Sequence, residues 1–398
     1  MNAFHPQCGS VPAPRGASLG DFVDNFRYQT ISDSAFRVNA HLPPHYQSRI
    51  FEEGLRVATE VLRPRDLTHR RVLLVGGAGY IGSVLTEHLL SRDYQVRCLD
   101  ALLYSNQVTV LPFLSRPGYE FNEGSLTDPD TIRQALAGVT DVVILAGLVG
   151  DPITKKYPEM SQRINHDGIL HLIDQLRGNG LNKVVFVSTC SNYGLIPANA
   201  VADETYELSP LSLYAKAKVA VEREFLSTQI KAAYCPTVLR FATAFGLSPR
   251  MRFDLTVSEF TRAMYLREPL VVFDADTWRP YCHVQDFAEV IRRVLEAPRD
   301  IVAGEVFNAG GDMNNYTKKM IVDAVLALLP GAPVTYQARG SDPRNYRVNF
   351  AKIRQALAFE PRYAVPDGIA ELVRCLRQGL FRHVDQPRSF FGNYELAA

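Results

Sequence analysis

Short runs of apolar, β-branched residues alternate with amphipathic stretches along most of the chain. The clearest runs are Arg71–Val75, Tyr94–Asp100, Asp141–Ala146, Asn182–Ser188 and Thr237–Phe241. Such runs are typical of strands that are buried on both faces of a parallel sheet. Stretches with helical spacing lie between and after them, at 81–91, 213–226, 286–297 and 317–329. This alternation predicts an α/β protein with a Rossmann-type, doubly wound parallel sheet.

The pattern divides the chain into three parts. Residues 1–68 form an N-terminal extension whose opening part is rich in Pro, Gly and Ser, and only residues 48–62 have helical spacing. We therefore expect the extension to be partly loose, with one helix. Residues 69–247 contain the predicted strands and form the expected Rossmann domain. Residues 248–398 contain segments rich in Arg, Pro and aromatic residues, which predict a smaller C-terminal substrate lobe with some segments returning to the sheet.

Composition narrows the class of protein. The 43 Lys and Arg residues nearly cancel the 42 Asp and Glu residues, so no basic surface for nucleic acid is expected. No apolar run reaches the roughly 20 residues that span a membrane. The six cysteines are scattered and form no CxxC motif, which argues against a metal site and favours reduced thiols. Because the first residues also lack the apolar core of a signal peptide, a cytoplasmic location is expected.

A glycine motif follows the first predicted strand directly. Gly76, Gly79 and Gly82 give the pattern GxxGxxG, with Tyr80 and Ile81 inside it. The glycines allow a tight turn, a close approach of the backbone to a pyrophosphate, and packing of the next helix on the strand. Asp100 ends the second strand, where a carboxylate accepts hydrogen bonds from ribose hydroxyls and repels a 2′-phosphate. The pattern predicts a dinucleotide site that prefers NAD to NADP.

A second motif supplies groups for proton transfer. Tyr214 and Lys218 are spaced i, i+4 in a helical stretch and therefore lie on one helix face, whereas Lys216 does not share that face. A lysine ammonium near a phenol favours the phenolate and lowers the tyrosine pKa from its usual value of about 10. Thr189 supplies a hydroxyl at the carboxyl end of a predicted strand, within the segment STCSNYG. These residues predict a general acid–base site.

The motifs occur in the order found in the extended short-chain dehydrogenase/reductases. Over roughly residues 70–380, the chain resembles the NAD-dependent epimerase/dehydratase family, which includes UDP-galactose 4-epimerase-like nucleotide-sugar enzymes. The resemblance implies an NAD cofactor and a nucleotide-diphosphate sugar as substrate. It also implies a homodimer formed by two helices of each subunit, here near residues 167–176 and 213–226.

The resemblance also assigns roles to individual residues. Thr189 stands at the catalytic hydroxyl, Tyr214 at the base, and Lys218 at the lysine that also reaches the nicotinamide ribose. Further cofactor contacts are implied for Ser125, Leu126, Leu145, Ala146 and Gly147. Asn165 resembles the family's helix asparagine, for which a direct role and a structural hydrogen bond are equally open.

The expected substrate residues lie mostly beyond residue 240. Arg279 and Arg339 resemble arginines that bind the substrate diphosphate, and Thr243 falls where the 4-epimerases often have asparagine. Arg250 and Arg252 add positive charge nearby. Cys190, Ser191 and Asn192, which follow the catalytic threonine, are expected on the substrate side. His283 is expected to be structural rather than catalytic.

The residues after Thr189 bear on the choice of reaction. Members of the resembling family first oxidise a sugar carbon, usually C4. Its 4,6-dehydratases place Asp-Glu where this chain has Cys190 and Ser191, and its decarboxylases often carry Glu at the second position. Epimerisation is therefore favoured, with dehydratase, decarboxylase and dehydrogenase as alternatives. Cys190 is either an unusual acid–base group or part of the pocket wall. An NAD-binding structural or sensor protein is the non-enzyme alternative.

Overall fold

The computed structural model describes residues 70–197, 199–227, 234–338, 344–381, 384 and 390–397. The helix predicted at 48–62 and Arg339 lie outside the described residues. None of the helices in the described part of the chain is long and apolar enough to cross a membrane.

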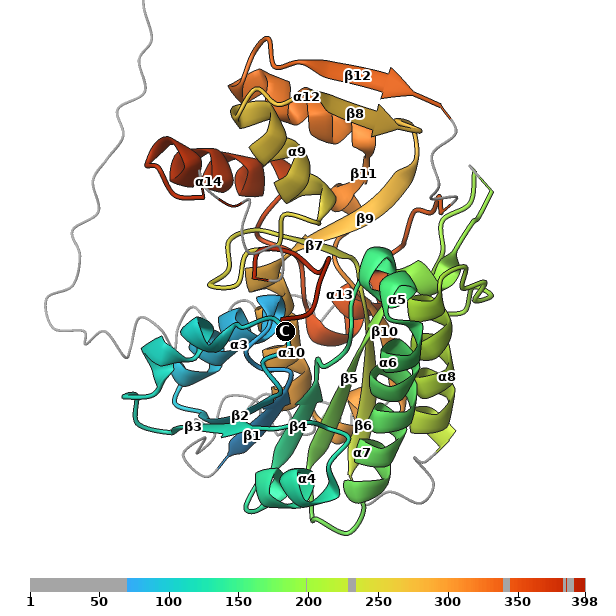
Figure 1. The fold of residues 1–398 in the computed structure, drawn as a ribbon. Helices are drawn as coiled ribbons and strands as arrows, with labels where there is room; N and C mark the ends of the chain where they lie inside the picture. Colours follow the sequence, from blue (N-terminus) through green and yellow to red (C-terminus); the bar gives the residue numbers. More distant parts are fainter. Residues whose placement is uncertain are drawn as a thin grey trace, which may run out of the picture. The chain divides into compact units, whose positions relative to one another are not determined.

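A seven-stranded parallel sheet forms the centre of the described region, with the order β3-β2-β1-β4-β5-β6-β10 (Figure 1). The strands are β1 (Arg71–Val75), β2 (Gln95–Asp100), β3 (Tyr119–Glu123), β4 (Asp141–Ile144), β5 (Lys183–Thr189), β6 (Cys235–Phe241) and β10 (Glu305–Ala309). The order reverses between β1 and β4, which is where open α/β sheets bind ligands at their carboxyl edge. The Rossmann-type fold predicted from the sequence is confirmed.

Helices cover both faces of this sheet because its strands are apolar on both sides. Val72 and Leu74 of β1 belong to one buried cluster, which includes apolar residues of α3 (Tyr80–Leu90) and α10 (Val284–Glu296). Leu73 and Val75 belong to the cluster on the opposite face. That second face is covered by α4 (Pro129–Leu136), α7 (Ile169–Gln175) and α8 (Leu213–Ser227).

The remaining elements connect these layers or build a smaller lobe. On the α8 side lie α5 (Asp151–Lys156), α6 (Pro158–Gln162) and the π-helix η3 (Arg163–Gly168). The short 3₁₀ helices are η1 (Gln107–Thr109), η2 (Leu111–Phe113), η4 (Cys190–Tyr193) and η6 (Asp312–Asn314). The lobe contains β7 (Thr243–Phe245), β8 (Leu270–Phe273), β9 (Trp278–His283), β11 (Asn315–Thr317), β12 (Val334–Gln337), α9 (Thr256–Tyr265), α12 (Lys318–Leu328) and α14 (Val365–Arg377).

The chain does not stay in the lobe after residue 248. The lobe has its own buried cluster, formed by apolar residues of α9, α12 and α14. However, α10 packs in the cluster that covers one face of the main sheet, and β10 pairs in parallel with β6. Two further helices, α11 (Arg299–Val302) and α13 (Ala351–Leu357), lie near that edge. The main sheet is therefore completed by residues from the second half of the chain.

Candidate active site

A cavity of about 520 Å³ opens at the carboxyl ends of the central strands. All the residues that the sequence predicted to bind the cofactor line it: Gly76, Gly79, Tyr80, Ile81, Gly82, Asp100, Ser125, Leu126, Leu145, Ala146, Gly147, Tyr214 and Lys218. Thr189 lines it too. The structure therefore brings the glycine motif and the three predicted catalytic side chains into one space.

The glycine turn leaves room for a phosphate at the start of α3. Gly76 has φ +86°, and a Cβ there would lie 2.7 Å from the Ala146 nitrogen. A Cβ on Gly82 would lie 2.6 Å from Gly77 Cα, so helix and turn pack closely only with glycine. In contrast, the nearest atom to a Cβ on Gly79 would be the Gly76 oxygen, at 3.4 Å. The N-terminus of α3 is thus open to an anion, which its positive end attracts.

Polar atoms near the end of β2 also fit an adenosine diphosphate. Asp100 accepts hydrogen bonds from the Ala78 nitrogen at 3.0 Å and the Leu102 nitrogen at 2.9 Å. Burial raises the pKa of Asp100, while these bonds and the charge of Arg250 act in the opposite direction. Tyr104 Oη and Asn106 Oδ1 are buried and have no hydrogen-bond partner within the described residues. Both residues line the cavity, so these atoms can bind a polar ligand.

The three predicted catalytic residues come from two neighbouring elements. Thr189 ends β5, and its Oγ1 accepts a hydrogen bond of 3.1 Å from the Ser191 nitrogen at the start of η4. Tyr214 and Lys218 lie one turn apart on α8, and Lys218 Nζ is 5.8 Å from the Tyr214 ring centroid. Lys218 Nζ donates to the carbonyl oxygen of Val187 at 2.8 Å. Lys216 is exposed, as its position on another helix face predicts.

The electrostatics of this group differ from the prediction. Burial lowers the pKa of Lys218 to about 7, and the negative charge of Glu222 offsets only part of this effect. Burial also raises the pKa of Tyr214, and the cation that most opposes this rise is Arg252. The expectation that Lys218 brings the Tyr214 pKa toward neutrality is therefore wrong for this structure. The reason is that Lys218 is itself buried and only partly protonated near neutral pH.

Cys190 and Asn192 were predicted on the substrate side, and the structure corrects both. Cys190 is buried away from the cavity, and its Sγ donates to the Arg240 oxygen at 3.2 Å. Asn192 is fully buried, and its Nδ2 donates to Glu222 Oε1 at 2.7 Å. Glu222 in turn forms a buried ion pair of 2.9 Å with Arg240. The tight η4 turn directs these two side chains into the protein, where they hold the carboxyl end of β5.

Other predicted substrate residues do line the cavity. Ser191, Thr243 and Arg279 are among them. The Ser191 hydroxyl is 3.2 Å from that of Tyr346, and the Arg279 guanidinium lies 5.0 Å from the centre of the Tyr346 ring. His283 and Asn165 are structural: His283 Nε2 contacts Glu371 at 2.9 Å, and Asn165 donates to the Leu148 oxygen at 2.9 Å.

Sequence reasoning missed several cavity residues. Asp151, at the start of α5, forms an ion pair of 3.0 Å with Arg344, and both side chains line the cavity together with Tyr346. Arg344 and Tyr346 belong to the segment SDPRNYR, whose richness in arginine and aromatic residues was the available signal. Arg250, predicted to face the substrate, lines the same cavity and lies beside Tyr104 with 4.2 Å between guanidinium and ring centroid, near Asp100. Its contact with the substrate stays a prediction.

Comparison with known proteins identifies the family. Residues 72–310 match the model of the NAD-dependent epimerase/dehydratase family. This chain belongs to that family. A dTDP-glucose 4,6-dehydratase of Streptomyces niveus is 28% identical over 317 residues, which cover 77% of this chain and 93% of the relative. A UDP-glucose 4-epimerase of Mycolicibacterium smegmatis is 27% identical over 316 residues, covering 77% of this chain and 98% of the relative.

A solved structure of a related protein shares the fold of this chain. UDP-glucose 4-epimerase of Thermus thermophilus, in complex with NAD, superposes with a TM-score of 0.68 at 25% identity. The superposition covers 78% of this chain and all of that one. NAD is the cofactor of this epimerase/dehydratase family member, and the glycine turn, Asp100, Tyr104 and Asn106 are the residues that fit it.

Replacing Asp100 by alanine is expected to weaken NAD binding by about 1–3 kcal/mol, because charged hydrogen bonds to the ribose are lost. Isothermal titration of the cofactor-free protein measures the change. Asp130→Ala, at an exposed site on α4, is the matched control and should bind NAD normally. Equal or tighter binding of NADP⁺ by the unmutated protein would contradict the role given to Asp100.

Proposed function

We propose that this protein is an NAD-dependent nucleotide-sugar epimerase that acts through a transient keto-sugar, with oxidation at C4 and reduction on the other face. Bound NAD would supply the group that accepts hydride from the sugar carbon and gives it back. Tyr214 takes the proton of the sugar hydroxyl, and the Thr189 hydroxyl orients that oxygen by a hydrogen bond. Lys218 orders the nicotinamide ribose and the part of the site around Tyr214. Arg279 and the neighbouring Thr243 and Ser191 are proposed to contact the substrate. A cytoplasmic location stays a prediction.

One observation carries the choice of reaction. The two positions after Thr189 hold Cys190 and Ser191, so neither provides a carboxylate beside the catalytic hydroxyls. Cys190 is turned into the protein, and burial raises its thiol pKa, so it cannot serve as an acid–base group there. The cavity therefore has the tyrosine and threonine that epimerisation needs, and it lacks a proton shuttle at the place where the eliminating enzymes need one.

A dehydratase or decarboxylase is the second candidate, because Asp151 places a different carboxylate in the same cavity. Its ion pair with Arg344 has to break before it can transfer a proton freely, which makes it the weaker candidate for elimination. A net dehydrogenase would share the remaining residues. An NAD-binding structural or sensor protein is disfavoured by the joint presence of Thr189, Tyr214 and Lys218 in one cavity.

A screen of nucleotide sugars tests the proposal. The full-length protein, loaded with NAD, is incubated with UDP-, dTDP-, GDP- and CDP-sugars in D₂O, and products are analysed by mass spectrometry and NMR. We expect an epimer of unchanged mass, without deuterium at the oxidised carbon, because the same hydride is returned. The Tyr214→Phe variant serves as the negative control.

The other outcomes separate the alternatives. Loss of water with deuterium at C5 identifies a dehydratase, and loss of CO₂ identifies a decarboxylase. Stoichiometric NADH identifies a net dehydrogenase. Stable NAD binding without turnover of any sugar in the screen would favour the structural or sensor protein.

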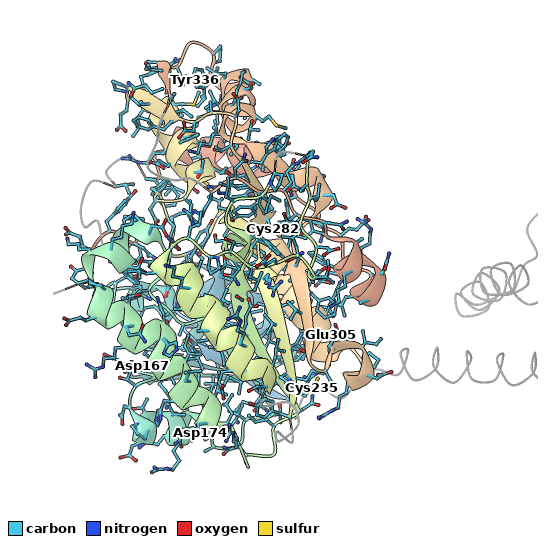
Figure 2. All side chains as sticks on the ribbon, turned by 90° about the vertical axis from the view of Figure 1, so that its right-hand side faces the viewer. Asp167, Asp174, Cys235, Cys282, Glu305 and Tyr336 are labelled. Atoms are coloured by element: carbon cyan, nitrogen blue, oxygen red, sulfur yellow. The ribbon has the colours of Figure 1, made fainter. Side chains whose placement is uncertain are left out.

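We also propose that the protein forms a homodimer through α8 and the neighbouring helices η3 and α7. These elements lie side by side on the outer face in Figure 2, where Asp167 and Asp174 are labelled, with side chains 60% and 64% exposed. Because α8 also carries Tyr214 and Lys218, packing between subunits would steady the active site. Sedimentation velocity at micromolar concentration should give a dimer, and a monomer there would refute the proposal.

A further inference from the structure

The segment Phe390–Ala397 connects the lobe to the loops around the cofactor cavity. The Phe391 oxygen accepts a hydrogen bond of 2.8 Å from the Phe253 nitrogen in the lobe. At the other end, the Ala397 nitrogen donates to the Leu103 oxygen at 2.8 Å, in the loop after β2. Leu396 packs against the small cluster of Tyr104, Leu148 and Ile153. The C-terminal end lies between the sheet and the lobe in Figure 1, so this segment crosses from one to the other.

Asn393 is the central contact of this segment. It is 3% exposed, and its Nδ2 donates to the Val149 oxygen at 2.7 Å. Its Oδ1 accepts a hydrogen bond of 2.8 Å from Arg250 Nη2. Val149 and Arg250 line the cavity, whereas Asn393 lies behind them. The hydrogen bonds of Asn393 therefore act on a bound molecule through these two residues.

Arg250 is held beside the open N-terminus of α3. The Ser248 hydroxyl donates to the Tyr80 oxygen at 2.7 Å, and the Tyr80 hydroxyl donates to the Gly246 oxygen at 2.6 Å. These bonds dock the strand-following segment on the first turn of α3, next to the glycine motif. Burial, and after it the charge of Arg252, lower the pKa of Arg250 to about 10, so its guanidinium stays charged at neutral pH.

A buried cation at this place is suited to an anion. Arg250 is nearly excluded from solvent, and a cation desolvated in this way gains most from a charged hydrogen-bond partner. The first turn of α3 lines the same cavity, and the backbone nitrogens at a helix N-terminus attract anions. Arg252, the neighbouring arginine, pairs with Asp254 and donates to the Val149 oxygen at 3.2 Å. The Arg250 guanidinium lies 4.2 Å from the centre of the Tyr104 ring, and its charge acts on Asp100.

We propose that the segment Phe390–Ala397 braces the NAD site, and that Asn393 is a positioning residue that holds Arg250 toward the cofactor diphosphate. This assigns a role in cofactor retention to residues outside the range matched by the family model, which ends at residue 310. The two hydrogen bonds of Asn393 fix the guanidinium and the loop after β4 relative to each other. The Arg250 side chain therefore loses its conformational entropy during folding and not when the cofactor binds.

Cofactor dissociation from the full-length protein tests this. NAD bound per chain is measured after gel filtration, and its dissociation rate by stopped-flow chase with excess unlabelled NAD. Asn393→Ala is expected to release NAD about 10- to 100-fold faster, the range for losing a positioned charged hydrogen bond. The matched control is Asn179→Ala, an exposed asparagine after α7, which should release NAD at the rate of the unmutated protein.

Two further variants distinguish positioning from general loosening. Asn393→Asp keeps an acceptor for Arg250 but loses the donor to the Val149 oxygen, so its release rate should lie between those of Asn393→Ala and the unmutated protein. Arg250→Met should release NAD as fast as Asn393→Ala, and adding Asn393→Ala to it should change little, because both act through one guanidinium. The melting temperature of each cofactor-free variant reports its folding. Unchanged release by Asn393→Ala overturns the proposal, and a full additive effect in the Arg250→Met background overturns the positioning role.

Discussion

Tyr214→Phe is expected to lower kcat by about 10²–10⁴-fold on the true nucleotide sugar, which is the contribution of a positioned acid–base group. The phenol hydroxyl is the atom removed, and the ring keeps its packing on α8. Because burial raises the Tyr214 pKa, the unmutated enzyme should turn over faster as pH rises through the alkaline range and more phenolate forms. The variant should lose this pH dependence, and KM should change little.

Steady-state kinetics between neutral and alkaline pH measure both effects. Tyr336→Phe, an exposed tyrosine on β12, is the matched control and should keep full activity. Thr189→Val should reduce kcat less than Tyr214→Phe, since it removes orientation and leaves the base in place. Near-complete turnover by Tyr214→Phe would show that the proton relay is assigned to the wrong residue.

Lys218→Met is expected to lower kcat by about 10²-fold while raising the stability of the cofactor-free protein by about 1–3 kcal/mol. The ammonium is fully buried, with the Val187 oxygen as a hydrogen-bond partner and the Phe186 ring centroid 4.6 Å away. Methionine fills the same space without the desolvation cost of a charge. The loss of the Lys218 hydrogen bond to the Val187 oxygen only partly offsets this gain in stability.

The pH dependence of this stability difference has a defined sign. The folded-state pKa of Lys218 is lowered to about 7, so protonation favours the unfolded chain. The destabilisation by the buried Lys218 charge is therefore fully present below pH about 7. It fades as pH rises toward about 10.4, the pKa of lysine in the unfolded chain. Denaturant unfolding should show the advantage of Lys218→Met shrinking over that range. Lys216→Met, at an exposed site on the same helix, should change neither stability nor kcat. A destabilised Lys218→Met protein would contradict this account.

The fold was accessible from the sequence because its strongest signals are local. Strand β1 and the glycine turn were predicted at their observed positions, since a buried apolar run followed by glycines leaves few alternatives. The same holds for Asp100 and for the spacing of Tyr214 and Lys218. In each case the functional residues lie within a few positions of a strand or helix whose hydrophobic periodicity can be recognised in the sequence.

The substrate side was less accessible because it is assembled from distant segments. Asp151 and Arg344 are almost 200 residues apart and meet only in the folded chain. The direction of a side chain in a tight turn was also hidden: Ser191 faces the cavity, while Cys190 and Asn192 on either side face the core. The charge of Lys218 was hidden too. Helical spacing predicts that Lys218 shares a helix face with Tyr214, but it does not predict the burial that lowers the pKa of Lys218.

The position of β10 has a consequence for synthesis on the ribosome. Strand β6 ends at residue 241, but the neighbour that covers its outer edge, β10, begins only at residue 305. The α10 helix, which covers apolar residues of α3, also emerges after residue 283. A nascent chain that has already formed β1 to β6 therefore exposes an apolar face for more than forty further residues, until α10 begins, and a hydrogen-bonding edge for more than sixty, until β10 begins. Such edges pair with other chains. The speed of translation between β6 and β10 should therefore have a larger effect on the yield of folded protein than the stability of the finished fold has.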